Sequence, residues 1–226
     1  MPLTATELTA LIRTALEPLR NPSAAEPMAS YLRGLFPFLG IRQPVVTKLM
    51  QPLWRAAKPE ATGKLVLAVA RQLWKLPERE YHHVAVELLV RFHPLLGPDS
   101  LPAIRGLIEQ KSWWDSVDGL AAWVVGPLVA RFPELRAEMD RWSEDPNFWI
   151  RRTAILHQLD HKKGTDAPRL FAYCARNAGD PEFFIRKAIG WALRQYARTD
   201  PKAVRKFVAD HPELSALSRR EALKHL

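Results

Sequence analysis

Two segments in the last third of the chain repeat the same order of residue types. The segment DPNFWIRRTAI at residues 145–155 returns as DPEFFIRKAI at residues 180–189, an offset of 35 residues. One further offset upstream falls on Trp113-Trp114, and a looser echo appears at Arg79-Glu80-Tyr81. A fixed period of this length, with one aromatic-led helix per unit, is typical of stacked helical hairpins that bury their apolar faces against their neighbours.

The remaining pattern is also helical. Segments of about ten to twenty residues carry apolar residues at i, i+3, i+4 and i+7, whereas period-2 alternation and hairpin turns are almost absent. The 19 prolines lie mostly at the expected helix starts, where a missing N–H costs nothing. We expect helices to begin near Thr6, Ala24, Pro44, Pro59, Pro77, Pro102, Ser112, Pro133, Asn147, Ala167, Pro181 and Pro201.

These patterns predict an all-α fold of repeats. The spacing is similar to that of tetratricopeptide units, but their Trp-x-x-Leu-Gly-x-x-Tyr pattern is missing, so HEAT-like repeats fit better. No linker of low complexity interrupts the chain. We therefore predict a single domain over residues 1–226, in which the repeats form a curved α–α superhelix, or solenoid.

Composition excludes several classes of protein. The chain is 47% hydrophobic and 25% charged, which fits neither a disordered nor a membrane protein. Its first twenty residues carry charges at helical spacing and do not read as a signal peptide. The single cysteine, Cys174, excludes an intramolecular disulfide and a cysteine-based zinc site, as expected for a reducing cytosol.

Positive charge is concentrated near the C-terminus. The whole chain has a net charge of +9, and residues 145–226 hold 16 Lys+Arg against 9 Asp+Glu, a balance of +7. Such a basic face indicates a polyanionic partner, either nucleic acid or an acidic membrane surface. A solvated helical surface without a partner explains the charge alone equally well.

One carboxylate is unexplained by the helical pattern. Ser112 and Asp115 have the spacing of a capping box, which gives Asp115 a structural role. Asp118 lies one turn further along an otherwise apolar helix, at i+4 from Trp114. A carboxylate there is costly to bury unless it is paired or lines a cleft. It is either paired with an arginine of the next repeat or catalytic.

A row of cations follows one side of a helix in the second repeat. Lys187, Trp191, Arg194 and Arg198 are spaced at i, i+4, i+7 and i+11, and Arg152 occupies the position of Lys187 one repeat earlier. Three cations around one indole suit a phosphate-binding surface with an aromatic that touches a base or sugar. The alternative is a cation–π contact made for packing alone.

Metal and nucleophile motifs are weak. His157 and His161 are spaced at i, i+4, but no Glu follows His157 and no third ligand is evident, so we predict no metal site and assign both to the surface or a helix end. A phosphate loop and a nucleophile elbow are also missing.

With these residues in place, the chain resembles the AlkD-type DNA alkylation repair glycosylases, a family of HEAT-like repeat proteins. The resemblance is carried in order by blocks that span nearly the whole chain: residues 31–41, 73–81, 112–118, 147–159, 182–194 and 217–224.

The resemblance implies a monofunctional glycosylase that removes N3- and N7-alkylated purines from duplex DNA without a metal or organic cofactor. It implies a concave basic surface that holds the duplex without a deep base pocket. We also expect the protein to work as a monomer, without a membrane or an obligate protein partner. Its expected location is the cytoplasm, on nucleoid DNA. The family's functional positions match a catalytic Asp118, active-site Trp114 and Trp191, backbone-contacting Arg152 and Arg194, and Tyr31 near the lesion.

The residues fit this chemistry, because a fixed carboxylate stabilises the oxocarbenium-like transition state of glycosidic bond cleavage. Two other functions share part of the pattern. A non-catalytic HEAT-like module that binds DNA or RNA structure shares the basic row but does not need Asp118. A protein–protein scaffold needs neither feature.

Overall fold

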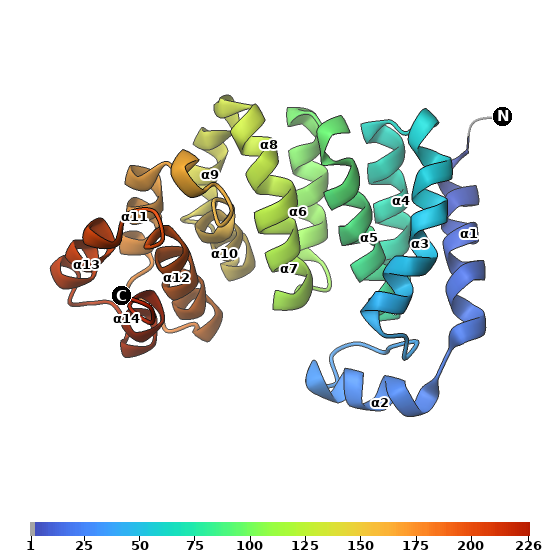
Figure 1. Cartoon of the computed structure of the whole chain (residues 1–226), viewed down its shortest axis with the longest axis horizontal. Helices are drawn as coiled ribbons and strands as arrows, with labels where there is room; N and C mark the ends of the chain where they lie inside the picture. The colour runs from blue at the N-terminus through green and yellow to red at the C-terminus, as the bar shows by residue number, and fades with distance from the viewer. Residues whose placement is uncertain (1–2) are drawn as a thin grey trace. The chain divides into compact units, whose positions relative to one another are not determined.

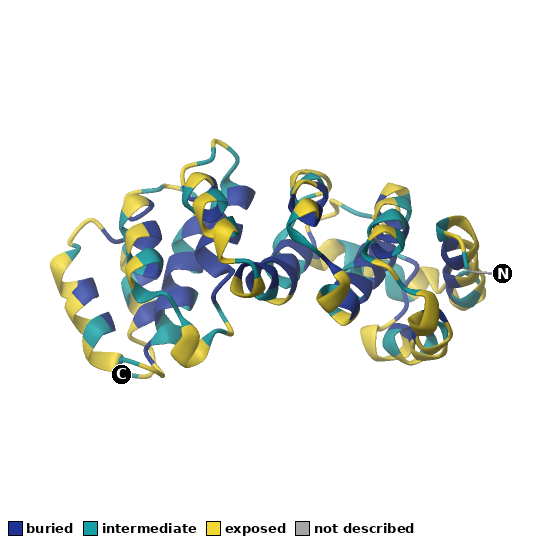
Figure 2. Ribbon diagram, turned by 90° about the horizontal axis from the view of Figure 1, so that it is seen from above, coloured by how far each residue is buried: buried dark blue, intermediate teal, exposed yellow. Residues whose placement is uncertain are grey.

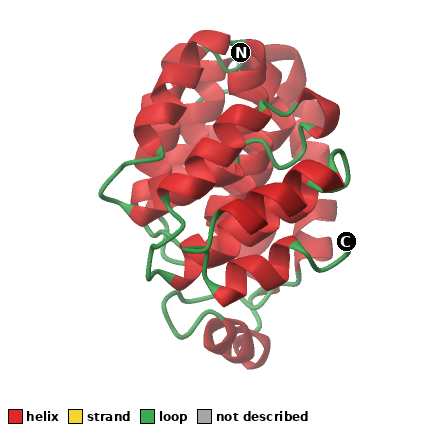
Figure 3. Cartoon of the chain, turned by 90° about the vertical axis from the view of Figure 1, so that its left-hand side faces the viewer, coloured by secondary structure: helices red, strands yellow, loops and turns green. Residues whose placement is uncertain are grey.

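The structure, a computed structural model, describes residues 3–226 as helices joined by short turns (Figure 1). Within this range every regular element is helical and no strand is present (Figure 3), which confirms the all-α prediction. None of the helices described is long and apolar enough to cross a membrane. The chain forms two compact units, Met1–Ala103 and Ile104–Leu226. The single domain and the concave basic face stay predictions.

The first unit is built from five long helices. They are α1 (Ala5–Leu16), α2 (Pro22–Tyr31), α3 (Gln43–Ala57), α4 (Gly63–Lys75) and α5 (Arg79–Phe92). Helix α4 packs against α1 and α5. The buried faces, dark blue in Figure 2, carry aliphatic residues at helical spacing, such as Val66, Val69 and Leu73 of α4. Burial of such faces is the main term that holds short helices together.

A buried carboxylate fixes the loop between α2 and α3. Glu80 is 2% exposed, and it accepts the backbone N–H groups of Leu39, Gly40 and Ile41 at 2.8, 2.8 and 3.1 Å. Gly40 has φ +89°, and a Cβ on it would lie 2.1 Å from the carbonyl oxygen of Asn21. The loop that follows the end of α2 is therefore held rigidly.

The remaining helices belong to the second unit, apart from the first turn of α6, which precedes the boundary at Ile104. They are α6 (Leu101–Glu109), α7 (Trp114–Leu120), α8 (Gly126–Arg131), α9 (Arg136–Trp142), α10 (Phe148–Leu156), α11 (Ala167–Arg176), α12 (Phe183–Tyr196), α13 (Pro201–Asp210) and α14 (Ala216–Ala222). A π-helical turn, Ala121–Val125, joins α7 to α8. Helix α12 packs against both α10 and α14. Helix α12 buries Ile185, Ile189 and Ala192.

The sequence repeat is also a structural repeat. The Oδ1 atoms of Asp145 and Asp180 accept the backbone N–H two residues ahead, at 2.8 and 2.7 Å. Six residues after each aspartate, Arg151 and Arg186 donate back to its carbonyl oxygen at 2.6 and 2.9 Å. The same hydrogen bonds therefore start α10 and α12, as the 35-residue offset predicts.

Two predicted helix starts are wrong. Pro59 and Pro133 lie in 3₁₀ turns, Lys58–Glu60 and Pro133–Leu135, and the α-helices begin later. Proline favours any first helical turn, so its presence does not distinguish a 3₁₀ turn from an α-helix. The side chain of Thr62 accepts the N–H of Leu65 and so starts α4 at Gly63.

Candidate functional site

Asp118 lies on α7, and this helix contacts α10. The helix begins at Trp114, after an extended Trp113 with φ −160° and ψ 158°. The predicted capping box is wrong: Ser112 Oγ donates to the carbonyl oxygen of Ile108 at 2.6 Å and so serves the end of α6. Asp115 lies in the first turn of α7, where the helix dipole favours a negative charge.

The carboxylate of Asp118 is held by Arg152 on α10. Arg152 Nε and Nη2 donate to Oδ1 and Oδ2 of Asp118, both at 2.7 Å. The arginine side chain is 1% exposed, whereas that of Asp118 is 23% exposed. Pairing with an arginine of the next repeat, one of the two alternatives for Asp118, is therefore confirmed. A bidentate pair also orients the carboxylate and leaves part of it open to solvent.

Arg152 connects Asp118 to α12. Its third nitrogen, Nη1, donates to the carbonyl oxygen of Phe184, and its Cζ lies 5.4 Å from the centre of the Trp191 ring. Each guanidinium nitrogen thus has a protein acceptor. The contact with a DNA phosphate expected of Arg152 stays a prediction, and it requires the side chain to leave these partners. In this geometry Arg152 orients Asp118.

The electrostatic setting of Asp118 contains two opposing effects. Burial raises the pKa of Asp118 above its ordinary value, and the hydrogen bonds and positive charge of Arg152 oppose that rise. The nearby Asp115 adds a small rise of its own. Arg152 thus favours the ionised form of this carboxylate, whereas burial favours the protonated form.

Aromatic side chains pack behind this pair. The Trp113 ring lies 5.0 Å from Phe184 and 5.9 Å from Trp149, and the rings of Trp149 and Phe184 are 4.9 Å apart. Trp149 and Phe184 are equivalent positions of the sequence repeat. The cluster fixes the start of α7 against α10 and α12, which sets the position of Asp118.

The segment that begins with α7 reaches a close backbone contact at the start of α8. A Cβ on Gly126, the first residue of α8, would lie 2.1 Å from the carbonyl oxygen of His157 at the end of α10. The π-helical turn lies between Asp118 and this contact. Such turns frequently occur at functional sites, and no pattern of residues indicated this one.

Trp191 lies at the centre of a second cluster on α12. Lys187 Nζ is 5.1 Å from the centre of its ring. Lys187 Nζ and Arg194 Nη1 donate to Oε1 and Oε2 of Glu221 on α14, at 2.8 and 2.7 Å. The cation–π packing considered for Trp191 is thus present. Glu221 was not among the predicted site residues.

The structure brings five of the predicted residues into one connected group. A chain of contacts runs from Asp118 through Arg152 and Trp191 to Lys187, and Glu221 links Lys187 to Arg194. The other three are Trp114, Arg198 and Tyr31. Trp114 is partly exposed one turn before Asp118, Arg198 is exposed just after α12, and Tyr31, at the end of α2 in the first unit, is 74% exposed.

Comparison with known proteins gives the chain a family. A family model for DNA alkylation repair enzymes matches residues 12–226. The chain belongs to the DNA alkylation repair enzyme family. A solved structure described as a predicted DNA alkylation repair enzyme from Enterococcus faecalis matches it with a TM-score of 0.85 and 32% identity, over 92% of this chain and 96% of that one. A search of curated proteins found no match.

Membership of the DNA alkylation repair enzyme family confirms the predicted resemblance and supports an enzymatic role in the repair of alkylated DNA. It also suggests DNA as the substrate of the chain, because DNA is what such enzymes repair. The Asp118 group lies wholly within the matched range.

His157 and His161 lie at and just after the end of α10, in the second unit. His157 is the C-cap of α10, which confirms one of the two places expected for it, and it is 2% exposed. Its Nδ1 lies 2.7 Å from the Ala154 carbonyl oxygen, and burial lowers its pKa to about 4. Over residues 3–226 there is no cluster of three or more His, Cys, Asp or Glu residues that could hold a metal.

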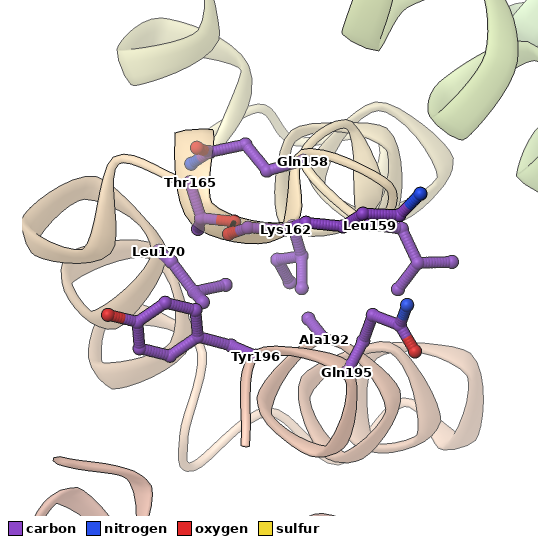
Figure 4. Close-up of a pocket in the computed structure, with 9 residues that line it drawn as sticks. Gln158, Leu159, Lys162, Thr165, Leu170, Ala192, Gln195 and Tyr196 are labelled. Carbon is purple, nitrogen blue, oxygen red and sulfur yellow. Dashed lines mark hydrogen bonds between the residues drawn. The ribbon is translucent and has the colours of Figure 1, made fainter. Parts of the chain in front are cut away.

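Two hollows open near the end of α10. One of about 120 Å³ is lined by His157, His161, Arg136, Asp166 and Arg169, among others. The other, of about 10 Å³, lies between the segment after α10 and helix α12, with Gln158 and Leu159 on one side and Gln195 and Tyr196 on the other (Figure 4). The smaller hollow has room for one water at most. Neither hollow is lined by Asp118.

Proposed function

We propose that the chain is a monofunctional DNA glycosylase that hydrolyses the N-glycosidic bond of N3- and N7-alkylated purines in duplex DNA. The observation that carries this proposal is the Asp118 carboxylate, which is 23% exposed and is oriented by a buried arginine. The arginine is fully covered, whereas the carboxylate keeps part of its surface open, so a ligand can reach the acid but not its partner.

Cleavage of the N-glycosidic bond of an alkylated purine requires one fixed negative charge near the sugar. An alkylated purine is cationic, so its glycosidic bond is already weak and the base leaves with the bonding electron pair, which neutralises it. The sugar then resembles an oxocarbenium ion, which Asp118 stabilises electrostatically. Asp118 also orients the attacking water, whose oxygen bonds to C1′ and whose proton passes to the carboxylate. No cofactor is needed for this step.

The aromatic and basic residues have separate roles in this proposal. Trp114 and Trp191, both partly exposed, offer electron-rich ring faces to the cationic sugar and base. Lys187, Arg194 and Arg198 bind flanking phosphates and set the register of the duplex. Tyr31 contacts DNA near the lesion.

A second function is a non-catalytic module that binds DNA or RNA structure. It uses the same cations, and the near-complete occupation of Arg152 by protein acceptors is compatible with it. It gives Asp118 no role beyond the ion pair, however, and does not explain why the carboxylate stays partly open.

Release of free base separates the two functions. The protein is incubated with duplex DNA treated with a methylating agent, and the supernatant is assayed for 7-methylguanine and 3-methyladenine. The glycosylase releases both bases and leaves abasic sites. DNA that is bound but releases no base at any enzyme concentration would favour the binding module and contradict the proposal.

A further inference from the structure

Glu221 brings a nearly buried carboxylate to the cations that flank Trp191. Its side chain is 14% exposed, and its two oxygens accept from Lys187 and Arg194 at 2.8 and 2.7 Å. The hydrogen bond from Lys187 is the main cause of a lowered pKa of Glu221, so the carboxylate is ionised. One acid therefore bridges two of the proposed phosphate-binding residues.

The position of Glu221 is set by close backbone packing. A Cβ on Gly190 would lie 2.4 Å from Glu221 Cβ and 3.2 Å from the carbonyl oxygen of Ser218, so α14 approaches α12 as only glycine allows. Ser218, which is fully buried, donates from Oγ to the carbonyl oxygen of Arg186 at 3.0 Å. Figure 1 shows α14 beside α12 at the C-terminal end of the second unit. The carboxylate is thus held by a docked helix.

The two cations keep donors for other partners. Lysine carries three N–H donors and arginine five, and each gives one to Glu221 in this structure. Lys187 precedes Trp191 by four residues and Arg194 follows it by three, so both border the indole on one side of α12. Flexible side chains that are already held lose less freedom when they bind a phosphate.

We propose that Glu221 is a positioning residue, which holds Lys187 and Arg194 in the geometry that places a DNA phosphate beside Trp191. This inference rests on the proposed function, since it assigns DNA to the cations. Glu221 does not touch the reacting atoms. Its negative charge opposes nonspecific attraction of DNA, so its contribution is to geometry and not to the strength of the electrostatic field.

A matched ion pair distinguishes positioning from a general structural role. Asp180 pairs with Arg151 at 2.7 Å, with side chains 14% and 18% exposed, close to the 14% and 22% of Glu221 and Lys187. It lies in the same unit but is not linked to Trp191 by these contacts. Asp180→Asn and Glu221→Gln each remove one negative charge and keep a hydrogen-bond acceptor.

The first measurement separates binding from rate. Duplex affinity and the single-turnover rate of base release are measured for both variants. We expect Glu221→Gln to bind undamaged duplex within about threefold of wild type but to release base about tenfold more slowly, because small misplacements of positioning groups are costly in rate. We expect Asp180→Asn to keep the wild-type rate. An unchanged rate in Glu221→Gln, or equal losses in the two variants, would overturn the inference.

The second measurement uses binding alone, so it holds even if no base is released. Lys187→Met is made in the wild type and in Glu221→Gln, and the Kd for undamaged duplex is measured for all four proteins. If Glu221 positions Lys187, the loss caused by Lys187→Met is about threefold smaller in the Glu221→Gln background. Equal losses in both backgrounds would overturn the inference, whereas absence of base release by the wild type would contradict only the glycosylase.

Discussion

Arg152 holds the carboxylate of Asp118 through two parallel hydrogen bonds of 2.7 Å, between α10 and α7. The arginine is 1% exposed and the aspartate 23%. The buried Arg152 therefore orients the carboxylate of Asp118 and favours its ionised form, while part of that carboxylate stays accessible to solvent. This asymmetry is what makes Asp118 a candidate for catalysis even though it is paired.

The geometry of the guanidinium fork is the first point to test. Arg152→Lys keeps the charge but cannot make two parallel bonds and also reach the carbonyl oxygen of Phe184. We expect a loss of about 1–3 kcal/mol in the free energy of unfolding, measured by denaturant titration, because buried acceptors lose their donors. We also expect a lower rate of base release. Arg151→Lys on the same helix is the control, and equal effects on rate in both variants would contradict the assignment.

The packing of α14 on α12 gives a second prediction. Gly190→Ala places a methyl group 2.4 Å from Glu221 Cβ, so α14 must shift, and we expect the unfolding free energy to fall by about 1–3 kcal/mol. Gly106→Ala is the matched helical control, because nothing lies within 4 Å of its Cβ position, and it should stabilise by up to about 1 kcal/mol. Thermal denaturation of both variants measures the difference. Equal melting temperatures would show that α14 does not pack as described.

The buried His157 predicts a pH dependence of stability. Burial lowers its folded-state pKa to about 4, from 6.5 as the ordinary value. Between those two values the unfolded chain binds a proton that the folded chain does not, so stability is lost as pH falls from about 6.5 to about 4, by up to about 3 kcal/mol. His157→Asn keeps a donor to the Ala154 carbonyl oxygen but cannot titrate. We expect its unfolding free energy to fall less than that of wild type over this interval; parallel curves would rule out His157 as a source of the acid sensitivity.

The cations of α12 predict a salt dependence of DNA binding. Arg198 is exposed in the turn after α12, so Arg198→Gln should leave the melting temperature unchanged. If Arg198 binds a phosphate, the slope of log Kd against log salt should fall by about 1. Lys48→Gln on α3 is a control in the first unit. An identical slope for Arg198→Gln and wild type would remove Arg198 from the DNA contacts.

Much of the second unit could be predicted from the sequence, because its contacts are periodic. The repeat at 145–155 and 180–189 predicted equivalent helices, and they make equivalent hydrogen bonds. The cost of burying an acid led to a partner for Asp118 in the next repeat, 34 residues away. Glu221 instead follows Lys187 by 34 residues, on the opposite side along the chain, so the spacing of Asp118 and Arg152 did not indicate it.

Other features had no such signal. The π-helical turn ends next to the close approach between Gly126 and the end of α10, which only the folded chain shows. Arg152 and Lys187 are equivalent in the repeat, yet Arg152 is buried and Lys187 is 22% exposed. The difference comes from the neighbouring helices α7 and α14, since the repeat itself is identical in pattern at these positions. Sequence equivalence therefore predicted charge but not exposure.

Replacement of the Asp118 carboxylate by an amide tests whether its negative charge drives base release. Asp118→Asn keeps the size of the side chain and an acceptor for Arg152 while it removes the negative charge. If Asp118 stabilises the transition state, we expect this variant to bind alkylated duplex DNA with an affinity close to that of wild type. It should release 7-methylguanine and 3-methyladenine at least about a hundredfold more slowly. Release of both bases by Asp118→Asn at the wild-type rate would contradict it.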